Sequence, residues 1–305
     1  MSQPSEVTNP LSWLPGFIAL GLVWGSSFLF IELALESFSP IGIAFLRSFL
    51  GGASLLIIVW ISKQKLPRNW KHWAHLFVVA ALLNAVPFAL FPLGQESVSS
   101  AIAGVVNSTT PLMTVLVVIV LFRDQWPTVN QIVGVIIGFS GILLLMEIFS
   151  SGSGGSVVGV SILLLATLCY GLGMSYAKRF VSSLPYSPYV LAASQVSAAT
   201  VLTAPAALLW GFTSAAPTQL SILGIGLLGI LGTGIAYVWN YRNIELAGSV
   251  VASSVTYITP VVAVVIGALF LREQLSATQL VGGVLILLSA LLVQGRIKLL
   301  PTREL

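Results

Sequence analysis

Two charged residues lie inside long apolar stretches of this 305-residue chain and are the first candidates for chemistry. Glu32 falls near the end of the apolar run 14–35, and Arg47 falls about two helical turns into the run 40–61. A charge in an apolar environment is costly and is usually retained for a function. Because the two runs would form a hairpin, the charges lie at similar depth and we predict that they interact. The pair would either fix the hairpin or bind a charged substrate, and both interpretations stay open.

Two prolines, Pro111 and Pro260, lie near the middle of two further apolar runs. A proline inside a helix leaves the carbonyl four residues earlier without its usual donor, and here those carbonyls belong to Asn107 and Thr256. In a membrane, such groups are satisfied by protein, water or ligand. Neighbouring hydroxyls would satisfy them in a simple kink. The occurrence of two equivalent prolines favours instead a substrate cavity centred between these two runs.

Aromatic and amide side chains form a third group of candidates. Aromatic rings with a polar edge suit a site for amphipathic organic molecules, although core packing explains them equally well. The candidate substrate-binding residues are Trp24, Asn84, Asn107, Pro111, Tyr170, Tyr237, Trp239, Asn240, Thr256, Tyr257 and Pro260.

Other kinds of chemistry are not indicated. The two histidines, His72 and His75, lie together with no second cluster to complete a metal site. Both histidines lie at the start of one run, no apolar run carries a pair of aspartates for intramembrane catalysis, and no Walker sequence is present for ATP. We therefore expect no enzyme activity, no cofactor and no metal.

The elements that carry these residues are membrane-spanning helices. The chain is 57% hydrophobic and only 7% charged, whereas soluble domains are about 25% charged. Apolar runs of about 20 residues, the length that crosses a bilayer, recur from end to end. We predict an all-α polytopic membrane protein with ten transmembrane helices, over residues 14–35, 40–61, 72–92, 97–122, 129–149, 157–179, 188–211, 219–241, 248–271 and 277–296.

The chain contains an internal repeat. Shifted by 149 positions, Glu96–Leu143 matches Glu245–Leu292 at 14 of 48 places, including both Thr-Pro pairs. Earlier in the repeats, Trp24 corresponds to Tyr170 and Arg47 to Gln195. We predict a first five-helix repeat over 1–149, a Gly/Ser linker over 150–156 and a second repeat over 157–305. Since five spans is an odd number, the second repeat enters the membrane inverted, a construction typical of secondary transporters.

The basic residues predict the orientation. Eleven of the thirteen lysines and arginines fall on the side of the N-terminus, so we expect both termini in the cytoplasm and Arg123 and Arg272 on opposite faces. Orientation explains the net charge of +4 without any binding of nucleic acid. Small residues spaced by four, such as Gly21/Gly25 and Gly134/Gly138, allow close helix contact within one chain or in a homodimer, and the sequence does not decide between them.

The run Leu22–Ile31, with Phe45-Leu46-Arg47 after it, and the repeated Thr-Pro and Arg-(Asp/Glu)-Gln hairpin resemble the EamA family of the drug/metabolite transporter superfamily. The resemblance implies two inverted five-helix repeats around a central cavity, with Trp24 and Arg47 at positions that recur in the family. It implies an exporter or facilitator of amino acids or other small metabolites in the bacterial inner membrane, similar to YddG-like and threonine/homoserine exporters, working by alternating access. The alternative is a structural or regulatory membrane subunit that transports nothing.

Overall fold

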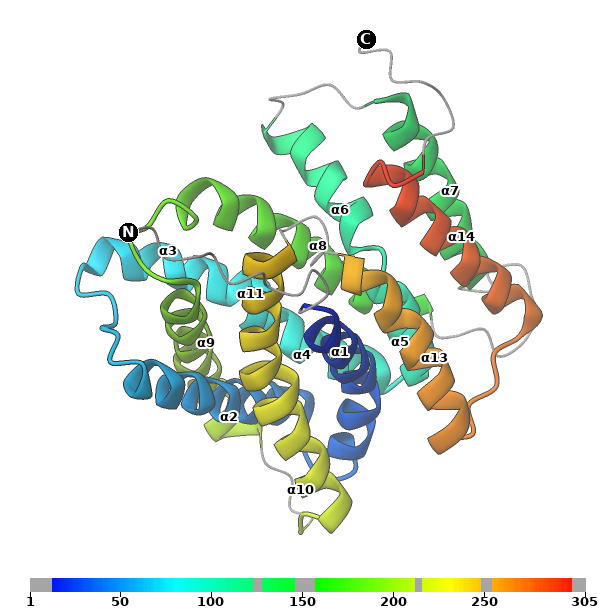
Figure 1. Ribbon diagram of the computed structural model, residues 1–305. Helices are drawn as coiled ribbons and strands as arrows, with labels where there is room; N and C mark the ends of the chain where they lie inside the picture. Colours follow the sequence, from blue (N-terminus) through cyan, green and yellow to red (C-terminus); the bar gives the residue numbers. More distant parts are fainter. Residues whose placement is uncertain (1–12, 123–127, 146–156, 212–215, 248–253, 298–305) are drawn as a thin grey trace.

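The computed structural model describes residues 13–122, 128–145, 157–211, 216–247 and 254–297, and these residues form helices and connecting loops with no extended sheet (Figure 1). The α-helices are α1 (Leu14–Leu35), α2 (Pro40–Ile61), α3 (Trp70–Ala80), α4 (Val86–Gln95), α5 (Ser100–Asn107), α6 (Thr110–Val117), α7 (Val129–Leu145), α8 (Val157–Phe180), α9 (Pro188–Trp210), α10 (Gln219–Gly226), α11 (Ala236–Ala247), α13 (Ile258–Phe270) and α14 (Ala277–Val293). These helices are continued by three π-helical turns, η1 (Ala81–Ala85), η2 (Val118–Phe122) and η3 (Leu227–Ile235), and by one 3-10 turn, η4 (Ser254–Tyr257).

The surface of the bundle is suited to lipid. In the described residues, seven helices are long and apolar enough to cross a bilayer, and three shorter apolar helices accompany them. Large apolar side chains point outward, for example Trp60 (79% exposed), Leu208 (75%) and Phe270 (71%). Exposed apolar surface on this scale is disfavoured in water and favoured against hydrocarbon tails.

Equivalent serines begin α2 and α9 in the same way. The Ser39 hydroxyl accepts from the Gly42 amide with Pro40 in the first turn, and Ser187 with Pro188 repeats the arrangement. Each serine also contacts the far end of the other helix: Ser39 donates to the Gly211 carbonyl just after α9, and Ser187 donates to the Gln64 side chain just after α2. The two corresponding helices therefore pack antiparallel.

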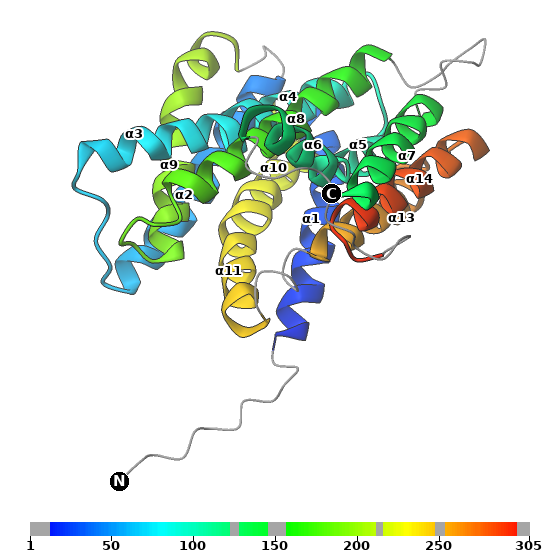
Figure 2. The ribbon, with the colours of Figure 1, turned by 90° about the horizontal axis from the view of Figure 1, so that it is seen from above.

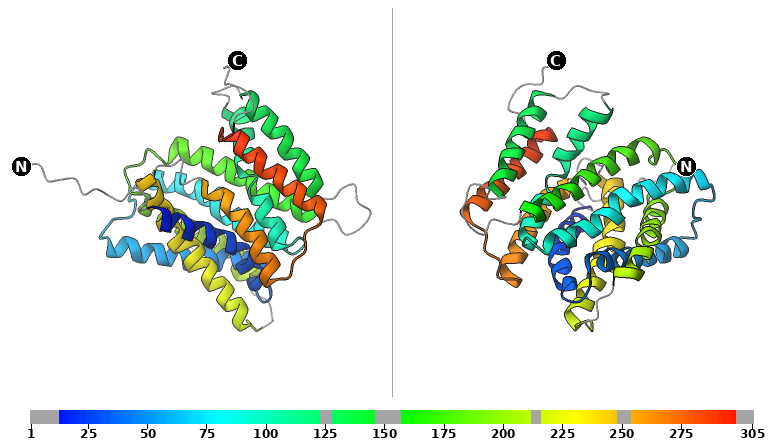
Figure 3. Two further views of the ribbon diagram at one scale, coloured as in Figure 1. Left: turned by 45° about the vertical axis from the view of Figure 1, so that its right-hand side comes forward. Right: turned by 180° about the vertical axis from the view of Figure 1, so that it is seen from behind.

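Two other pairs of corresponding spans also run antiparallel, namely the span of α5 and α6 with the span that ends in α13, and α7 with α14. Glu273, which follows α13, accepts from the first amides of α5, those of Ser100 (2.8 Å) and Ala101 (2.9 Å). Ser289 near the end of α14 donates to the Gly134 carbonyl near the start of α7 (2.7 Å). Helices α7 and α14 lie side by side in every view (Figure 1, Figure 2 and Figure 3).

Glycines permit corresponding close contacts elsewhere. A Cβ atom on Gly25 of α1 would lie 2.5 Å from Val262 of α13, and one on Gly171 of α8 would lie 3.0 Å from the backbone of Met113 in α6. The offset of 149 carries Met113 onto Val262, so the two repeats pack across each other through the same positions.

The predicted spans agree with the helices at most ends, and α1 and α2 coincide with the predicted 14–35 and 40–61. The two proline-containing spans differ. Instead of lying inside a continuous helix, Pro111 lies in the first turn of α6, after a two-residue turn that ends α5. Pro260 lies in the first turn of α13, directly after η4. A proline there has no intrahelical donor to lose, because first-turn amides lack a helical partner anyway.

Candidate functional site

Arg47 lies in a polar cluster formed by α2, α4 and η3. Its Nε donates to the Thr233 hydroxyl (3.0 Å), and its guanidinium carbon lies 3.8 Å from the centre of the Phe88 ring. The phenols of Tyr170 and Tyr237 lie close enough to act on its charge, and among the described residues it makes no ion pair. A hydroxyl and an aromatic face compensate a membrane-embedded cation only in part, so an anionic group would complete this site.

A chain of amides lies next to this cation. Gln195 of α9 donates from Nε2 to Asn84 Oδ1 (2.6 Å), and Asn84 donates from Nδ2 to the Tyr237 hydroxyl (3.2 Å). Asn84 is fully buried and Gln195 nearly so. Because unpaired amides are costly in an apolar interior, these bonds fix the orientation of all three side chains.

The two repeats supply corresponding residues to this cluster. The offset of 149 carries Asn84 onto Thr233 and Phe88 onto Tyr237, and Arg47 corresponds to Gln195. The bonds from Arg47 to Thr233 and from Gln195 to Asn84 are therefore the same bond made once by each repeat. Both acceptors lie in π-helical turns, η1 and η3, which frequently mark functional sites. The two repeats thus place equivalent positions in the cluster, but the first repeat contributes the charged Arg47 where the second contributes the neutral Gln195.

Trp24 and Tyr170, another corresponding pair, border the same cluster. Trp24 donates from Nε1 to the carbonyl of Gly232 (3.2 Å), the residue before the Arg47 acceptor. The Tyr170 ring stacks on Phe91 with 5.8 Å between ring centres. The structure thus brings together five of the residues singled out from the sequence, namely Trp24, Arg47, Asn84, Tyr170 and Tyr237.

Phe88 and Thr233 were not singled out from the sequence, and Gln195 was named only as the counterpart of Arg47. The signal that finds them is the repeat itself, because each corresponds in the other half to a residue that was selected or that contacts one. Extending the offset of 149 backward from Glu96 into the third and eighth predicted spans would have placed Thr233 and Phe88 in the site.

Trp239 and Asn240 lie elsewhere, on α11. Trp239 packs with Phe17 and Trp13 in an apolar cluster that Trp24 also contacts, and it lines a pocket of about 240 Å³ together with Arg242. The structure places Asn240 on the same helix as a partly buried residue. Their predicted contact with substrate stays a prediction.

The carbonyls before the two prolines are satisfied within the protein. Thr110 donates to the Asn107 carbonyl (2.8 Å), and its counterpart Thr259 donates to the Thr256 carbonyl (3.1 Å). The physical reason given for a hydrated cavity at this height is therefore wrong, since hydroxyls replace the missing amides. Helix α5 packs directly on α13 here, with a Cβ on Gly104 only 2.3 Å from that of Ala263. A substrate role for Asn107, Thr256, Tyr257, Pro111 and Pro260 stays a prediction.

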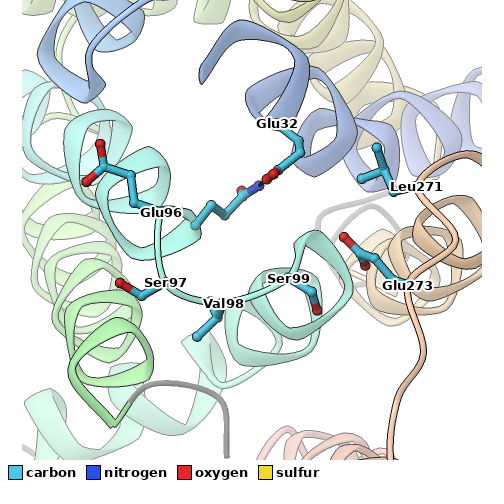
Figure 4. A pocket seen from close by; sticks show the side chains of 8 residues that line it. Glu32, Glu96, Ser97, Val98, Ser99, Leu271 and Glu273 are labelled. Atoms are coloured by element: carbon cyan, nitrogen blue, oxygen red, sulfur yellow. Dashed lines mark hydrogen bonds between the residues drawn. The ribbon is translucent and has the colours of Figure 1, made fainter. Parts of the chain in front are cut away.

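Glu32 and Arg47 do not meet. Glu32 accepts from Gln95 Nε2 (3.4 Å) and lines an open pocket of about 420 Å³ with Gln95–Ser99, Leu271 and Glu273 (Figure 4). Among the described residues, the predicted ion pair is absent. Similar depth in a hairpin is not enough to bring the two charges together. Their side chains contact different neighbours, Gln95 for Glu32 and Thr233 for Arg47.

A membrane-spanning helical bundle whose two repeats meet at a polar cluster has the construction of a transporter. Comparison with known proteins agrees. The model of the EamA-like transporter family matches this chain twice, over residues 11–147 and 157–294. The chain belongs to the EamA-like transporter family.

The chain is similar to several curated proteins over nearly its whole length. It is 29% identical to the uncharacterized inner membrane transporter YedA of Escherichia coli, covering 91% of this chain and 89% of that protein. It is 26% identical to an uncharacterized transporter of Archaeoglobus fulgidus, covering 88% and 94%, and 26% identical to protein PecM of Dickeya dadantii, covering 92% of each. One solved crystal structure matches with a TM-score of 0.63 at 19% identity, covering 92% of this chain and 96% of that one, and shows a common fold.

Proposed function

We propose that this protein is a secondary transporter, an exporter or facilitator of amino acids or related amphipathic metabolites. It works by alternating access in the inner membrane, with ten spans, both termini in the cytoplasm and the second repeat inverted. The antiparallel packing of α2 on α9, of the span with α5 and α6 on the span that ends in α13, and of α7 on α14 supports the inversion, because corresponding spans of inverted repeats must run in opposite directions.

The observation that carries the substrate class is the environment of Arg47. Its guanidinium is partly buried between helices, with a hydroxyl and a ring for partners and no ion pair in the described part of the chain. A carboxylate accepts charge-assisted hydrogen bonds from such a group and supplies the missing charge. The opposite repeat offers the neutral amides of Gln195 and Asn84, which suit the polar remainder of a small solute.

The aromatic side chains around the cluster suit an amphipathic solute. Phe88, Tyr170, Tyr237 and Trp24 come from four different helical segments and surround the polar groups. Sites of this kind combine apolar walls with a few oriented polar groups. An amino acid with an apolar side chain has both features.

Counterflow into proteoliposomes tests this function. Vesicles loaded with unlabelled leucine, phenylalanine or threonine are expected to accumulate the labelled amino acid above protein-free vesicles, without ATP. The matched amides leucinamide and phenylalaninamide, which lack the carboxylate, are expected to exchange at least tenfold more slowly. Equal exchange of acids and amides would remove the proposed role of Arg47, and no exchange of any of these solutes would overturn the substrate class.

A further inference from the structure

The pocket at the end of α1 has an acidic lining. Glu32 comes from α1, Glu96 from the segment after α4, and Glu273 from the segment after α13 (Figure 4). None of the described lining residues is basic, and Arg272, between two lining residues, is exposed and does not line the pocket. The pocket volume of about 420 Å³ is within the range of small-molecule sites.

Gln95 gives this pocket a buried amide side chain. Its Nε2 donates to the Phe28 carbonyl (2.9 Å) and to Glu32 Oε2 (3.4 Å). Because a carbonyl only accepts, the contact with Phe28 fixes which end of the amide is nitrogen. The other end, Oε1, is buried with no hydrogen-bond partner, in a side chain that is only 4% exposed and lines the pocket. A buried acceptor without a donor calls for a ligand or water that supplies one.

The three carboxylates are not equivalent. Both oxygens of Glu273 are engaged by the amides of Ser100 and Ala101, so this carboxylate is fixed in position at the rim. Glu96 is exposed. Glu32 is partly buried and receives one long hydrogen bond from Gln95 Nε2, which leaves its carboxylate with spare acceptor capacity. Acceptors of Glu32 and Gln95 in one acidic pocket call for a ligand that is both cationic and a donor.

We propose that this pocket binds an organic ammonium group, held by the Glu32 carboxylate and Gln95 Oε1. An ammonium group offers three N–H donors and one positive charge, which match the two acceptors. A metal ion such as Ca²⁺ would need about six or more oxygen ligands, and among the described residues no group of acidic, histidine or cysteine side chains is arranged to hold a metal. A lone proton would neutralise Glu32 but would leave Gln95 Oε1 unpaired.

The inference rests on the proposed function in one respect, namely that the ammonium group belongs to a transported molecule such as an amino acid. Binding is therefore tested apart from transport, by isothermal titration calorimetry of the purified protein in detergent at constant ionic strength. The probe is n-butylammonium, and the comparison compounds are n-butanol, which has no charge, and tetramethylammonium, which has charge but no N–H donor.

We expect n-butylammonium to bind and both comparison compounds to bind at least tenfold more weakly. Glu32→Gln, which keeps the size of the side chain, is expected to weaken n-butylammonium at least tenfold, and Gln95→Met, which removes Oε1, severalfold. Glu36→Gln is the matched control, because Glu36 lies one turn further along the chain, is exposed and is not in the pocket lining. It is expected to leave affinity unchanged.

Unchanged affinity in Glu32→Gln with an unaltered melting temperature would overturn the proposal. So would equal binding of tetramethylammonium, or displacement of n-butylammonium by equimolar sodium, which would identify a simple cation site. If n-butylammonium binds as expected and no amino acid crosses the membrane, the site stands and the transport proposal fails. If amino acids exchange while n-butylammonium does not bind, the transport proposal stands and the proposed ammonium site is wrong.

Discussion

Replacing Arg47 with glutamine is expected to abolish amino acid exchange while leaving the protein folded. The change gives both repeats a glutamine at this position and removes the charge that we assign to the substrate carboxylate. Truncating one partner of a buried charge pair costs about 2 to 5 kcal/mol, which corresponds to a fall in exchange of roughly thirtyfold to a thousandfold or more. The folding stability of the substrate-free protein is expected to fall only slightly, because among the described residues Arg47 has no ion-pair partner that would be left uncompensated.

Counterflow rates and melting temperatures of matched variants measure this effect. Arg68→Gln removes an exposed arginine in a loop and serves as the control for net charge. Arg47→Lys is expected to retain partial exchange, because an ammonium keeps the charge but not the planar fork of the guanidinium. If Arg47→Gln exchanges amino acids at the rate of the unmodified protein, the carboxylate is bound elsewhere.

A single methyl group added at Gly25 is expected to destabilise the whole bundle. A Cβ atom there would lie 2.5 Å from Val262 and 2.9 Å from the Thr259 carbonyl oxygen, so α1 and α13 would have to separate. Extra volume in a packed interface costs about 1 to 3 kcal/mol of folding stability. The clash is hard to relieve here, because one of the contacted atoms is the backbone carbonyl oxygen of Thr259. Gly25→Ala is therefore expected to lower the melting temperature by several degrees.

Gly226→Ala is the matched control for this variant. Gly226 also lies in a helix, but a Cβ atom there would meet nothing within 4 Å. Alanine favours helix over glycine by about 0.5 to 1 kcal/mol, so this change is expected to leave stability unchanged or to raise it. Both variants are compared by the thermal shift of intrinsic tryptophan fluorescence in the same detergent. Equal melting temperatures would show that the contact between α1 and α13 is looser than described.

Much of the fold is predictable from the sequence because its signals are local. Apolar runs define the spans, and Ser-Pro pairs at Ser39 and Ser187 define helix starts that the structure reproduces. The breaks before Pro111 and Pro260 were not predicted, although their cause is also local. Thr110 and Thr259 satisfy the carbonyls with their hydroxyls, so the chain can end one helix and begin the next.

The candidate site was predictable in part. Composition and depth identified Arg47, Asn84 and Tyr237, but depth along a helix does not tell which side of it faces a given neighbour. For that reason Glu32 was paired with Arg47, whereas the structure gives each of them a different partner. The correspondence between repeats carries the missing information, since it relates the bond of Arg47 with Thr233 to the bond of Gln195 with Asn84.

Cysteine accessibility at the central cluster tests the transport account most directly. In a Cys169→Ser background, Tyr237→Cys places one thiol beside Asn84 at the meeting point of the repeats. Alternating access predicts that a membrane-impermeant thiol reagent labels this cysteine from either face of reconstituted vesicles, and that the exchanged amino acid slows labelling from both. Labelling from neither face, or labelling that the amino acid does not slow, would contradict a central substrate site.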